Sequence, residues 1–436
     1  MPLNTINPSA IGSVPQPEPV LRPAQTSVQP LGRLKVSLTT ASGYMPVPGA
    51  SVQVSYTGNP DQIIEELSTD ESGQTETIEL PAPNRDYSLE PESGQPYSEY
   101  TLSVTAPGYE PIAVSGTQLL SGETALQNIR LAPQADQPGT RDIVIPPHTL
   151  YGEFPPKIAE TEIKPVDESG EIVLSRVVIP ETVIVHSGPP SDSGAANYYV
   201  SYRDYIKNVA CSEIYATWPE AAIYANILAI MSFALNRVYT EWYRNKGYNF
   251  TITSSTAFDQ CFVYGRNIFE NISVAVDNIF TNFLSRPNVR QPILTQYCDG
   301  QRVSCPGWLS QWGSKALADQ GYSAIDILRH YYGDSIYINS APQISGIPSS
   351  WPGTDLTIGS RGEKVLQMQE QLNRIARNYP ALPTIAADGI YGPATAAAVK
   401  KFQEIFNLPA TGVVDYPTWY KISQIYVGVS RIAELA

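Results

Sequence analysis

Two stretches near the C-terminal end decide how this part of the chain folds: LTIGSRGEKVLQMQEQLN (Leu356–Asn373) and DGIYGPATAAAVKKFQEIFNLPATGVVDYPTW (Asp388–Trp419). Their apolar residues recur three and four positions apart, which is the spacing of one helix face. The residues concerned are Val365, Leu366, Met368 and Leu372 in the first stretch, and Val399, Phe402 and Phe406 in the second. The spacing predicts helices over Glu363–Tyr379 and Thr395–Phe406. With a third over Tyr416–Leu435, they predict a three-helix unit spanning residues 346–436.

The same stretches resemble the three-helix peptidoglycan-binding domain found on many cell-wall hydrolases. The likeness is carried by Gly359-x-x-Gly362-x-x-Val365, Asp388-Gly389-Ile390-Tyr391-Gly392-Pro393-x-Thr395, Phe402-Gln403 and Thr411-Gly412-Val413-Val414-Asp415. The resemblance implies that peptidoglycan is a partner of this unit. Turns rich in glycine and proline expose backbone amides. We expect them to present a tyrosine ring as well, with Asp388, Tyr391 and Thr395 as wall-binding residues and the helix cap near Thr395.

Charge is distributed unevenly along the 436 residues, a length that suggests two to four domains. Residues 1–190 hold 23 acidic and 9 basic residues, whereas the remainder holds 19 of each, so the first part carries the whole net charge of -14. An acidic chain without a basic face argues against a nucleic-acid partner. The segment Met1–Gln25 lacks the basic and apolar regions of a Sec signal peptide, so we expect synthesis without Sec export. The most apolar run, Ala221–Leu235, is too short to span a bilayer and predicts a core helix, with no membrane partner.

The N-terminal part is predicted to consist of three segments. Residues 1–31 have the composition of a flexible arm. Residues 32–132 show period-two alternation over Arg33–Thr40, Ala50–Gly58, Tyr100–Tyr109 and Thr124–Pro133, which predicts a β-sandwich. This pattern resembles the carboxypeptidase-regulatory-like, transthyretin-like sandwich and implies no chemistry. Residues 133–200 are proline-rich and are predicted to form an extended connector with one or two strands.

Residues 201–345 are predicted to form a mainly helical domain with strand and loop insertions. Its helices are expected at Arg203–Tyr215, from Trp218 to Lys246, at Asn267–Leu284 and at Tyr322–Gly333. A loop-rich segment from Arg290 to Gly313 is where we expect a cleft. The whole chain is therefore predicted to be a multidomain α+β protein, with a sandwich, a mainly α domain and a three-helix unit in that order.

Two segments of the helical domain resemble the SpoIID/LytB family of sporulation wall enzymes. They are Asp204–Arg237, which contains Cys-Ser-Glu-Ile and Trp-Pro-Glu-Ala, and Pro306–Gly333, which contains Ser-Gln-Trp-Gly. The complete domain order resembles the spore cortex-lytic enzymes of clostridia. The resemblance implies a lytic transglycosylase of spore cortex peptidoglycan that needs no cofactor. It also implies a precursor held in the cortex or coat region of the spore and activated by a subtilisin-like germination protease. We expect processing near residues 171–180.

Glu213 is the acid that the resemblance places in the catalytic role. A lytic transglycosylase needs one carboxyl group, which protonates the glycosidic oxygen and then accepts a proton from the 6-hydroxyl of the sugar as it attacks. The residue pattern alone favours a solvated helix glutamate, and the resemblance favours catalysis. Glu220 suits the first turn of a helix, Glu241 suits an ion pair with Arg237 or Arg244, and Asp259 is predicted to bind substrate.

Further glycan contacts are predicted at Ser254, Ser255, Tyr297, Gln311 and Trp312. The chain departs from the family where many members have Tyr-His-Ser-Thr, because here the residues are Tyr-Cys-Asp-Gly (297–300). Since the histidine that binds zinc in some relatives is absent, we predict no metal. The residues leave two alternatives open: a catalytically inactive peptidoglycan-binding protein of the spore, and a glycosidase that uses water and a second carboxylate. Cys298 and Cys305 flank a glycine-containing loop and could pair or help to hold a metal, but the four cysteines are expected to be free thiols in a reducing compartment.

Overall fold

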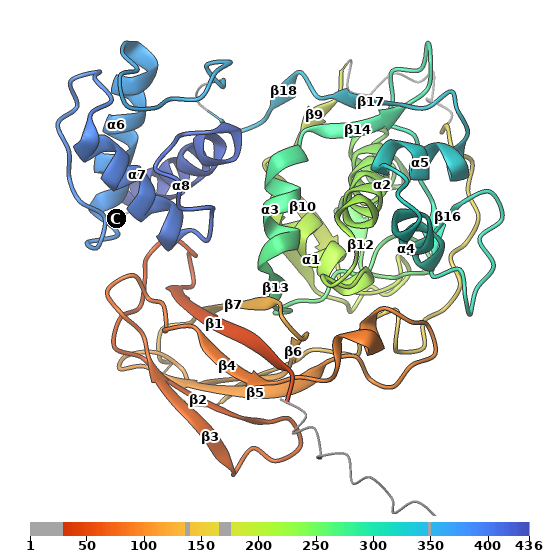
Figure 1. Cartoon of the computed structure of the whole chain (residues 1–436), viewed down its shortest axis with the longest axis horizontal. Coiled ribbons are helices and arrows are strands. Elements are labelled where there is room, and N and C mark those ends of the chain that lie inside the picture. The colour runs from red at the N-terminus through yellow and green to blue at the C-terminus, as the bar shows by residue number, and fades with distance from the viewer. Residues whose placement is uncertain (1–28, 136–139, 165–175, 348–349, 436) are drawn as a thin grey trace, which may run out of the picture.

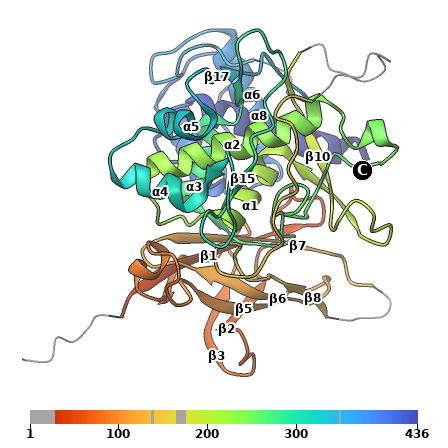
Figure 2. The same cartoon turned by 90° about the vertical axis from the view of Figure 1, so that its right-hand side faces the viewer.

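The computed structural model of the protein describes residues 29–135, 140–164, 176–347 and 350–435, so most of the predicted arm lies outside the described residues. Figure 1 shows a β-rich N-terminal part on which a large helical unit and a smaller C-terminal helical unit both rest. The expectation of a multidomain chain that combines sheets and helices is confirmed. Figure 2 shows the two helical units on the same side of the β-rich part.

The N-terminal strands form two sheets. One has the order β3 (Ile63–Ser68), β2 (Ser51–Tyr56), β5 (Ser98–Thr105), β6 (Ile112–Leu119) and β8 (Arg141–Val144), and the other has β13 (Ile268–Phe269), β7 (Thr124–Leu131), β1 (Leu31–Thr40) and β4 (Ile78–Pro81). In β1 the alternation works as predicted, because Leu34, Val36 and Leu38 are fully buried. Strands β3, β4 and β6 were not predicted; β3 is a charged edge strand, β4 has only four residues, and β6 has no simple alternation because its last four residues are all buried.

Strand β13 belongs to the helical unit by sequence, yet it pairs with β7 and completes the N-terminal sheet. Polar contacts reinforce this junction. Arg266 donates to the Gln118 side chain at 2.6 Å, and Asn267 exchanges two 3.0 Å hydrogen bonds with the Gln118 backbone. Trp218 donates to the carbonyl of Ser88 at 2.9 Å. The N-terminal sheets are therefore docked onto the helical unit through hydrogen bonds between buried polar groups of the two parts.

The helical unit contains α1 (Tyr202–Glu213), α2 (Glu220–Tyr239), α3 (Glu270–Ile279), α4 (Gln311–Asp319) and α5 (Ala324–Tyr332), with α2 at its centre. By length and composition α2 is apolar enough to cross a membrane, but 83% of the relevant window is buried within the protein. Helix α2 ends seven residues before the predicted Lys246, because the backbone turns at Glu241, where φ is 47°. Helix α4 begins at a Ser310 cap inside the segment expected to be loop.

Short strands connect the helices. They form the sheet β11 (Asn197–Ser201), β10 (Thr182–His186) and β12 (Ile252–Thr253), and the pairs β14 (Asn282–Ser285) with β17 (Tyr337–Ser340), β15 (Tyr297–Cys298) with β16 (Leu309–Ser310), and β18 (Gln343–Ile344) with β9 (Val178–Ile179). Residues 133–200 thus contribute β8, β9, β10 and β11. The expectation of one or two strands in that segment was wrong, because β8 and β9 pair with distant strands and β10 pairs with both β11 and the distant β12.

The C-terminal unit contains α6 (Glu363–Ala376), α7 (Pro393–Ile405) and α8 (Tyr416–Leu435). Of the predicted apolar positions, Val365, Met368, Leu372, Val399 and Phe402 are buried, whereas Leu366 and Phe406 are half-buried. Helix α7 starts at Pro393 with Gly392 as its cap residue, which corrects the predicted cap near Thr395. Proline suits the first helical position because no backbone donor is needed there.

Candidate functional site

Glu213 is the last residue of α1, and its side chain is 3% exposed. Helix α1 is buried along most of its length, so its end lies inside the helical unit and not at the surface. Glu213 is therefore not the solvated helix glutamate that the residue pattern alone favoured.

The two carboxylate oxygens of Glu213 differ in their surroundings. Oε1 accepts a 2.7 Å hydrogen bond from the backbone N–H of Cys261, and Tyr297 also donates to this carboxyl group. Oε2 is buried and has no hydrogen-bond partner among the described residues. Burial raises the pKa of Glu213, while nearby Lys157, the Cys261 amide and Tyr297 act in the opposite direction. A buried carboxyl group with one uncommitted oxygen suits a general acid.

A chain of side chains fixes the Tyr297 hydroxyl beside Glu213. Tyr205 donates to the Gln260 oxygen at 2.9 Å, and the Gln260 amide donates to the Tyr297 hydroxyl at 3.1 Å. All three side chains are buried. Because the Tyr297 oxygen accepts from Gln260, its proton is directed toward Glu213. The residue pattern had given no signal for Gln260, whose role follows from α1, β15 and a loop meeting in space.

Glu213 opens onto a cavity of about 380 Å³. Its lining includes two of the predicted substrate residues, Tyr297 and Gln311, and also Thr256 and Arg302, which were not predicted. One wall comes from far upstream in the sequence: Thr149, Glu153, Phe154, Pro155, Pro156 and Lys157. The cleft expected near Arg290–Gly313 is thus present as a cavity, but the proline-rich connector forms one of its walls.

Three other predicted glycan contacts lie outside the cavity lining. Ser254 donates its backbone N–H to His186, and the Ser255 carbonyl accepts from Phe258 and Asp259, so both belong to a turn. Trp312 is buried, and its ring centroid lies 5.0 Å from that of Trp218. The burial of Trp312 corrects its prediction as a glycan contact, whereas Ser254 and Ser255 are half-buried and their glycan contacts stay a prediction.

Asp259 also serves the fold and does not line the cavity. Its Oδ1 accepts from Arg237 Nε at 2.7 Å, and its Oδ2 accepts from the Tyr243 hydroxyl at 2.6 Å and from the Thr253 amide and hydroxyl at 2.9 and 2.7 Å. The residue is fully buried. The prediction that Asp259 binds substrate is therefore corrected, since its carboxylate already has four donors from the protein.

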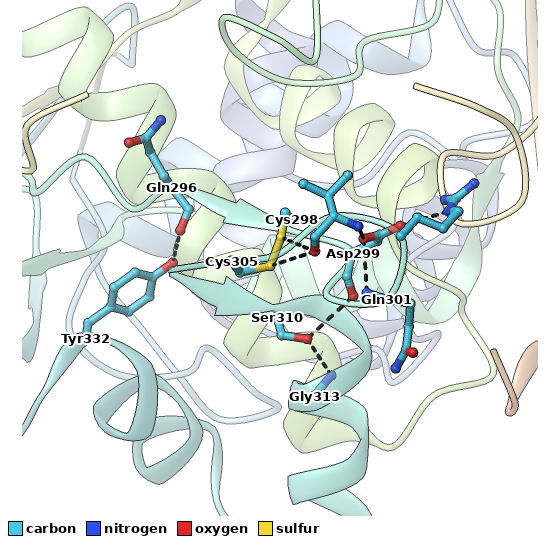
Figure 3. Close-up of a disulfide and its surroundings, with 10 residues drawn as sticks. Gln296, Cys298, Asp299, Gln301, Cys305, Ser310, Gly313 and Tyr332 are labelled. Carbon is cyan, nitrogen blue, oxygen red and sulfur yellow. Dashed lines mark hydrogen bonds and ion pairs between the residues drawn. A yellow bond between two sulfur atoms is a disulfide. The ribbon is translucent and has the colours of Figure 1, made fainter. Parts of the chain in front are cut away.

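Cys298 and Cys305 form a disulfide, which corrects the expectation of four free thiols (Figure 3). Their Cα atoms are 5.7 Å apart, within the range of disulfides. The enclosed loop turns at Gly300, where φ is 77° and a Cβ atom would collide with Ser310. The Ser310 hydroxyl donates to the Asp299 carbonyl at 3.5 Å and accepts from the Gly313 N–H at 2.9 Å, which joins the loop to the start of α4 (Figure 3). Cys211 and Cys261 are free and buried.

The predicted wall-binding residues of the C-terminal unit differ in accessibility. Asp388 is exposed, and its pKa is lowered by hydrogen bonds from the Ile390 amide and from Gln369. Tyr391 is 1% exposed and donates to the carbonyl of Gly412 at 2.8 Å, and Thr395 is 3% exposed. The expectation of an exposed Tyr391 ring and an accessible Thr395 was wrong, because both side chains are part of the core.

Within the described ranges, no group of three His, Cys, Asp or Glu side chains is placed to hold a metal ion. His330 is exposed on α5.

Comparisons with solved structures give only low similarity. The Bacillus anthracis TIE protein matches 24% of this chain and 17% of its own at 17% identity and a TM-score of 0.17. The minor pilin GBS52 from Streptococcus agalactiae matches 26% and 48%, at 17% identity and a TM-score of 0.18. A catechol 1,2-dioxygenase from Acinetobacter sp. ADP1 matches 28% and 60%, at 13% identity and a TM-score of 0.18. At TM-scores this low, the three matches give no information about the fold or function of this chain.

Comparisons of sequence identify the C-terminal unit. Residues 361–422 match the family model of the peptidoglycan binding domain. The zinc D-Ala-D-Ala carboxypeptidase of Streptomyces albus G is 44% identical over 77 residues, which make up 17% of this chain and 28% of that protein. The chain thus spans little more than a quarter of the length of this relative. The match to the family model ends before α8 does and does not include the unit that carries Glu213. The chain therefore carries a peptidoglycan-binding domain near its C-terminal end, which supports peptidoglycan as its partner.

Proposed function

We propose that the chain cleaves the glycan strands of peptidoglycan as a lytic transglycosylase of the SpoIID/LytB type, with Glu213 as general acid and base. The observation that carries the proposal is the buried Glu213 carboxyl group, whose Oε2 is uncommitted and which opens onto a cavity. A peptidoglycan-binding domain on the same chain supplies the matching substrate.

The proposed reaction uses one carboxyl group twice. Protonated Glu213 donates to the glycosidic oxygen as the bond to the anomeric carbon breaks. The resulting carboxylate accepts the proton of the muramic 6-hydroxyl as that oxygen attacks the anomeric carbon, which gives a 1,6-anhydro end and restores the acid. Burial supports the first step, because it raises the pKa of Glu213 and favours the protonated form. The Cys261 amide and the Tyr297 hydroxyl support the second step, since both donate to the ionised form.

The other carboxylates around the cavity favour a mechanism with a single acid. Of the described lining residues, Asp299 and Glu153 carry the remaining carboxyl groups. Asp299 is paired with Arg302 at 2.8 Å and accepts from the amides of Gln301 and Val303. Glu153 belongs to the upstream connector. Neither is a free carboxylate of the helical unit, so the water-dependent glycosidase is the weaker proposal. Tyr297, Gln311 and Thr256 are the proposed glycan contacts.

The C-terminal unit is proposed to anchor the enzyme on the wall. Because Tyr391 and Thr395 are buried, the wall-binding surface is proposed to consist of exposed groups near the same turn, namely Asp388, Ile390 and Ile358. Ile358 and Ile390 are 63% and 39% exposed, and the Gly359 N–H donates to the Tyr391 carbonyl at 2.9 Å, which holds the two segments side by side.

The biological setting is proposed from the resemblance to the SleC type of spore cortex-lytic enzyme. We propose that the substrate is spore cortex peptidoglycan, that the chain is a precursor stored in the cortex or coat region, and that a subtilisin-like protease activates it at germination. The predicted processing region lies partly outside the described residues, which resume at Arg176, just before β9.

The decisive experiment compares a Glu213→Gln variant with a Glu220→Gln control. Glu220 is an exposed carboxylate in the first turn of α2 and should not matter for activity. Each protein is nicked by a site-specific protease at a sequence introduced between residues 164 and 176, and is then incubated with purified cortex. We expect fragments with anhydro-muramic ends from the control. From Glu213→Gln we expect fewer by a factor on the order of 10²–10⁴.

Each alternative gives a different product. Reducing ends in place of anhydro ends would identify a glycosidase that uses water. Binding to cortex without any released fragment from nicked wild-type protein would identify a non-catalytic wall-binding protein. Unchanged release by Glu213→Gln would exclude this residue as the acid.

A further inference from the structure

Residues 148–164, called the strap below, connect the N-terminal sheets to the helical unit without forming a helix or strand of their own. The strap nevertheless makes regular hydrogen bonds along its length. Thr149 donates its hydroxyl to the Ser212 carbonyl at 2.9 Å, directly beside Glu213 in sequence. Further along, the Ile158 N–H donates to the Ala257 carbonyl at 2.7 Å. The strap therefore lies against the helical unit as an extended peptide.

Two buried glutamines bind the strap backbone from the helical unit. The Gln296 side chain accepts from the Glu160 N–H at 2.8 Å and donates to the Ile158 carbonyl at 2.7 Å. The Gln291 side chain accepts from the Lys164 N–H at 3.1 Å and donates to the Lys164 carbonyl at 3.0 Å. A primary amide that both donates to and accepts from a backbone recognises an extended peptide independently of its side chains.

Two arginines bind the strap carboxylates. Arg237 holds Glu160 through two nitrogens at 2.5 and 3.1 Å, and Arg286 holds Glu162 through two nitrogens at 2.8 Å each. Paired hydrogen bonds of this kind select a carboxylate by geometry as well as charge. Arg237, Arg286, Gln291 and Gln296, called the strap seat below, thus form a surface for an extended peptide with acidic side chains two residues apart.

The strap also reaches the reacting group. Between its two ends, Phe154, Pro155, Pro156 and Lys157 form one wall of the cavity that contains Glu213. The Lys157 ammonium lies 5.0 Å from the Phe233 ring centroid and 5.1 Å from that of Tyr297, and it donates to the Asp259 carbonyl. A cation near Glu213 favours the ionised carboxylate, and a covering wall keeps a glycan strand away. Both effects oppose the protonated, accessible acid that the proposed reaction needs.

We infer that the strap seat is a binding site for an extended acidic peptide, and that its occupant in the uncut chain, residues 148–164, inhibits the chain by closing the cavity over Glu213. This inference rests on the proposed function for its inhibitory part. It assigns a role to Arg286, Gln291 and Gln296 that the chemistry at Glu213 does not require. A cut in the proposed processing region, on the C-terminal side of Lys164, would leave the strap with one covalent connection in place of two.

A charge-reversal pair in the full chain tests the inference. Glu162→Arg places two like charges together and should unseat the strap, whereas the double variant Glu162→Arg/Arg286→Glu should restore the pair. Neither residue lines the cavity. Hydrogen exchange of residues 148–164, followed by mass spectrometry, reports seating of the strap independently of catalysis. Release of soluble fragments from purified cortex reports activity, and the nicked wild-type protein serves as the active reference.

We expect Glu162→Arg to lose exchange protection across the strap and to raise the activity of the uncut chain roughly tenfold or more. The double variant should recover both properties to within about twofold of wild type. The strap inference is overturned if uncut wild type is as active as the nicked protein, or if Glu162→Arg frees the strap without raising activity. Failure of the proposed function is distinct, because then no form, nicked or unseated, releases fragments.

Discussion

Replacing Asp259 by asparagine separates a structural role for this residue from the substrate-binding role predicted from sequence. The substitution keeps the size of the side chain but exchanges one acceptor oxygen for an NH₂ donor. If the NH₂ group takes the place of Oδ1, it faces the Arg237 Nε donor, and if it takes the place of Oδ2, it faces the Thr253 backbone donor. Either orientation leaves two donors opposed in a fully buried site.

The expected loss of stability is large. Breaking a buried charge pair by removing one charge costs about 3–5 kcal/mol, and the lower end applies here because Arg237 keeps its second partner, Glu160. We therefore expect Asp259→Asn to lower the free energy of unfolding by about 3 kcal/mol, which corresponds to a urea midpoint lower by roughly 1–2 M. Urea unfolding of the full chain is monitored by tryptophan fluorescence. Binding to purified peptidoglycan is measured in parallel.

A matched control is Glu404→Gln in the C-terminal unit. Glu404 pairs with Lys401 at 3.3 Å on the surface, where the two side chains are 45% and 41% exposed, so its loss should cost at most about 0.5 kcal/mol. The structural interpretation of Asp259 fails if Asp259→Asn unfolds at the same urea concentration as this control. If stability is unchanged but less fragment is released, or more substrate is needed for half-maximal release, Asp259 would instead be a substrate ligand.

Three further outcomes follow from the site and the C-terminal unit. Tyr391→Phe should lower the free energy of unfolding by about 0.5–1.5 kcal/mol through loss of one buried hydrogen bond, without weakening peptidoglycan binding in a pull-down assay; a large loss of binding would contradict the buried placement. Tyr297→Phe removes a hydrogen bond that lowers the pKa of Glu213, so the acid stays protonated to higher pH. The alkaline limb of the pH–activity profile of nicked protein should therefore move to higher pH. A shift to lower pH would contradict the assigned contact. Replacing Cys298 and Cys305 together by serine should lower the free energy of unfolding by about 2 kcal/mol, measured against wild type with and without a reductant; equal stability in all samples would show that the bridge contributes nothing.

The C-terminal unit shows how far local pattern carries a prediction. Its three helices were predicted close to their observed bounds, because three- and four-residue spacing of apolar side chains specifies which face of a helix is buried. The same reasoning misplaced Tyr391 and Thr395. A motif indicates that these residues matter, but it does not distinguish a ligand contact from a hydrogen bond that holds the turn onto the helices.

By itself, the sequence determined the succession of β-rich, helical and three-helix parts, the peptidoglycan-binding character of the last part, and Glu213 as the residue to examine. Periodicity and motif order are local properties, and local interactions are sufficient to specify them. Only the tertiary structure decided the surroundings of Glu213: the Cys261 amide and Tyr297 that contact it, the burial that separates it from solvent, and the strap that covers it. These groups come from segments far apart in the chain, and their proximity depends on how the helices and loops pack around α2. Because a carboxyl group acts as an acid, a salt-bridge partner or a surface charge according to what surrounds it, only packing could give Glu213 the buried setting on which its proposed role as general acid rests.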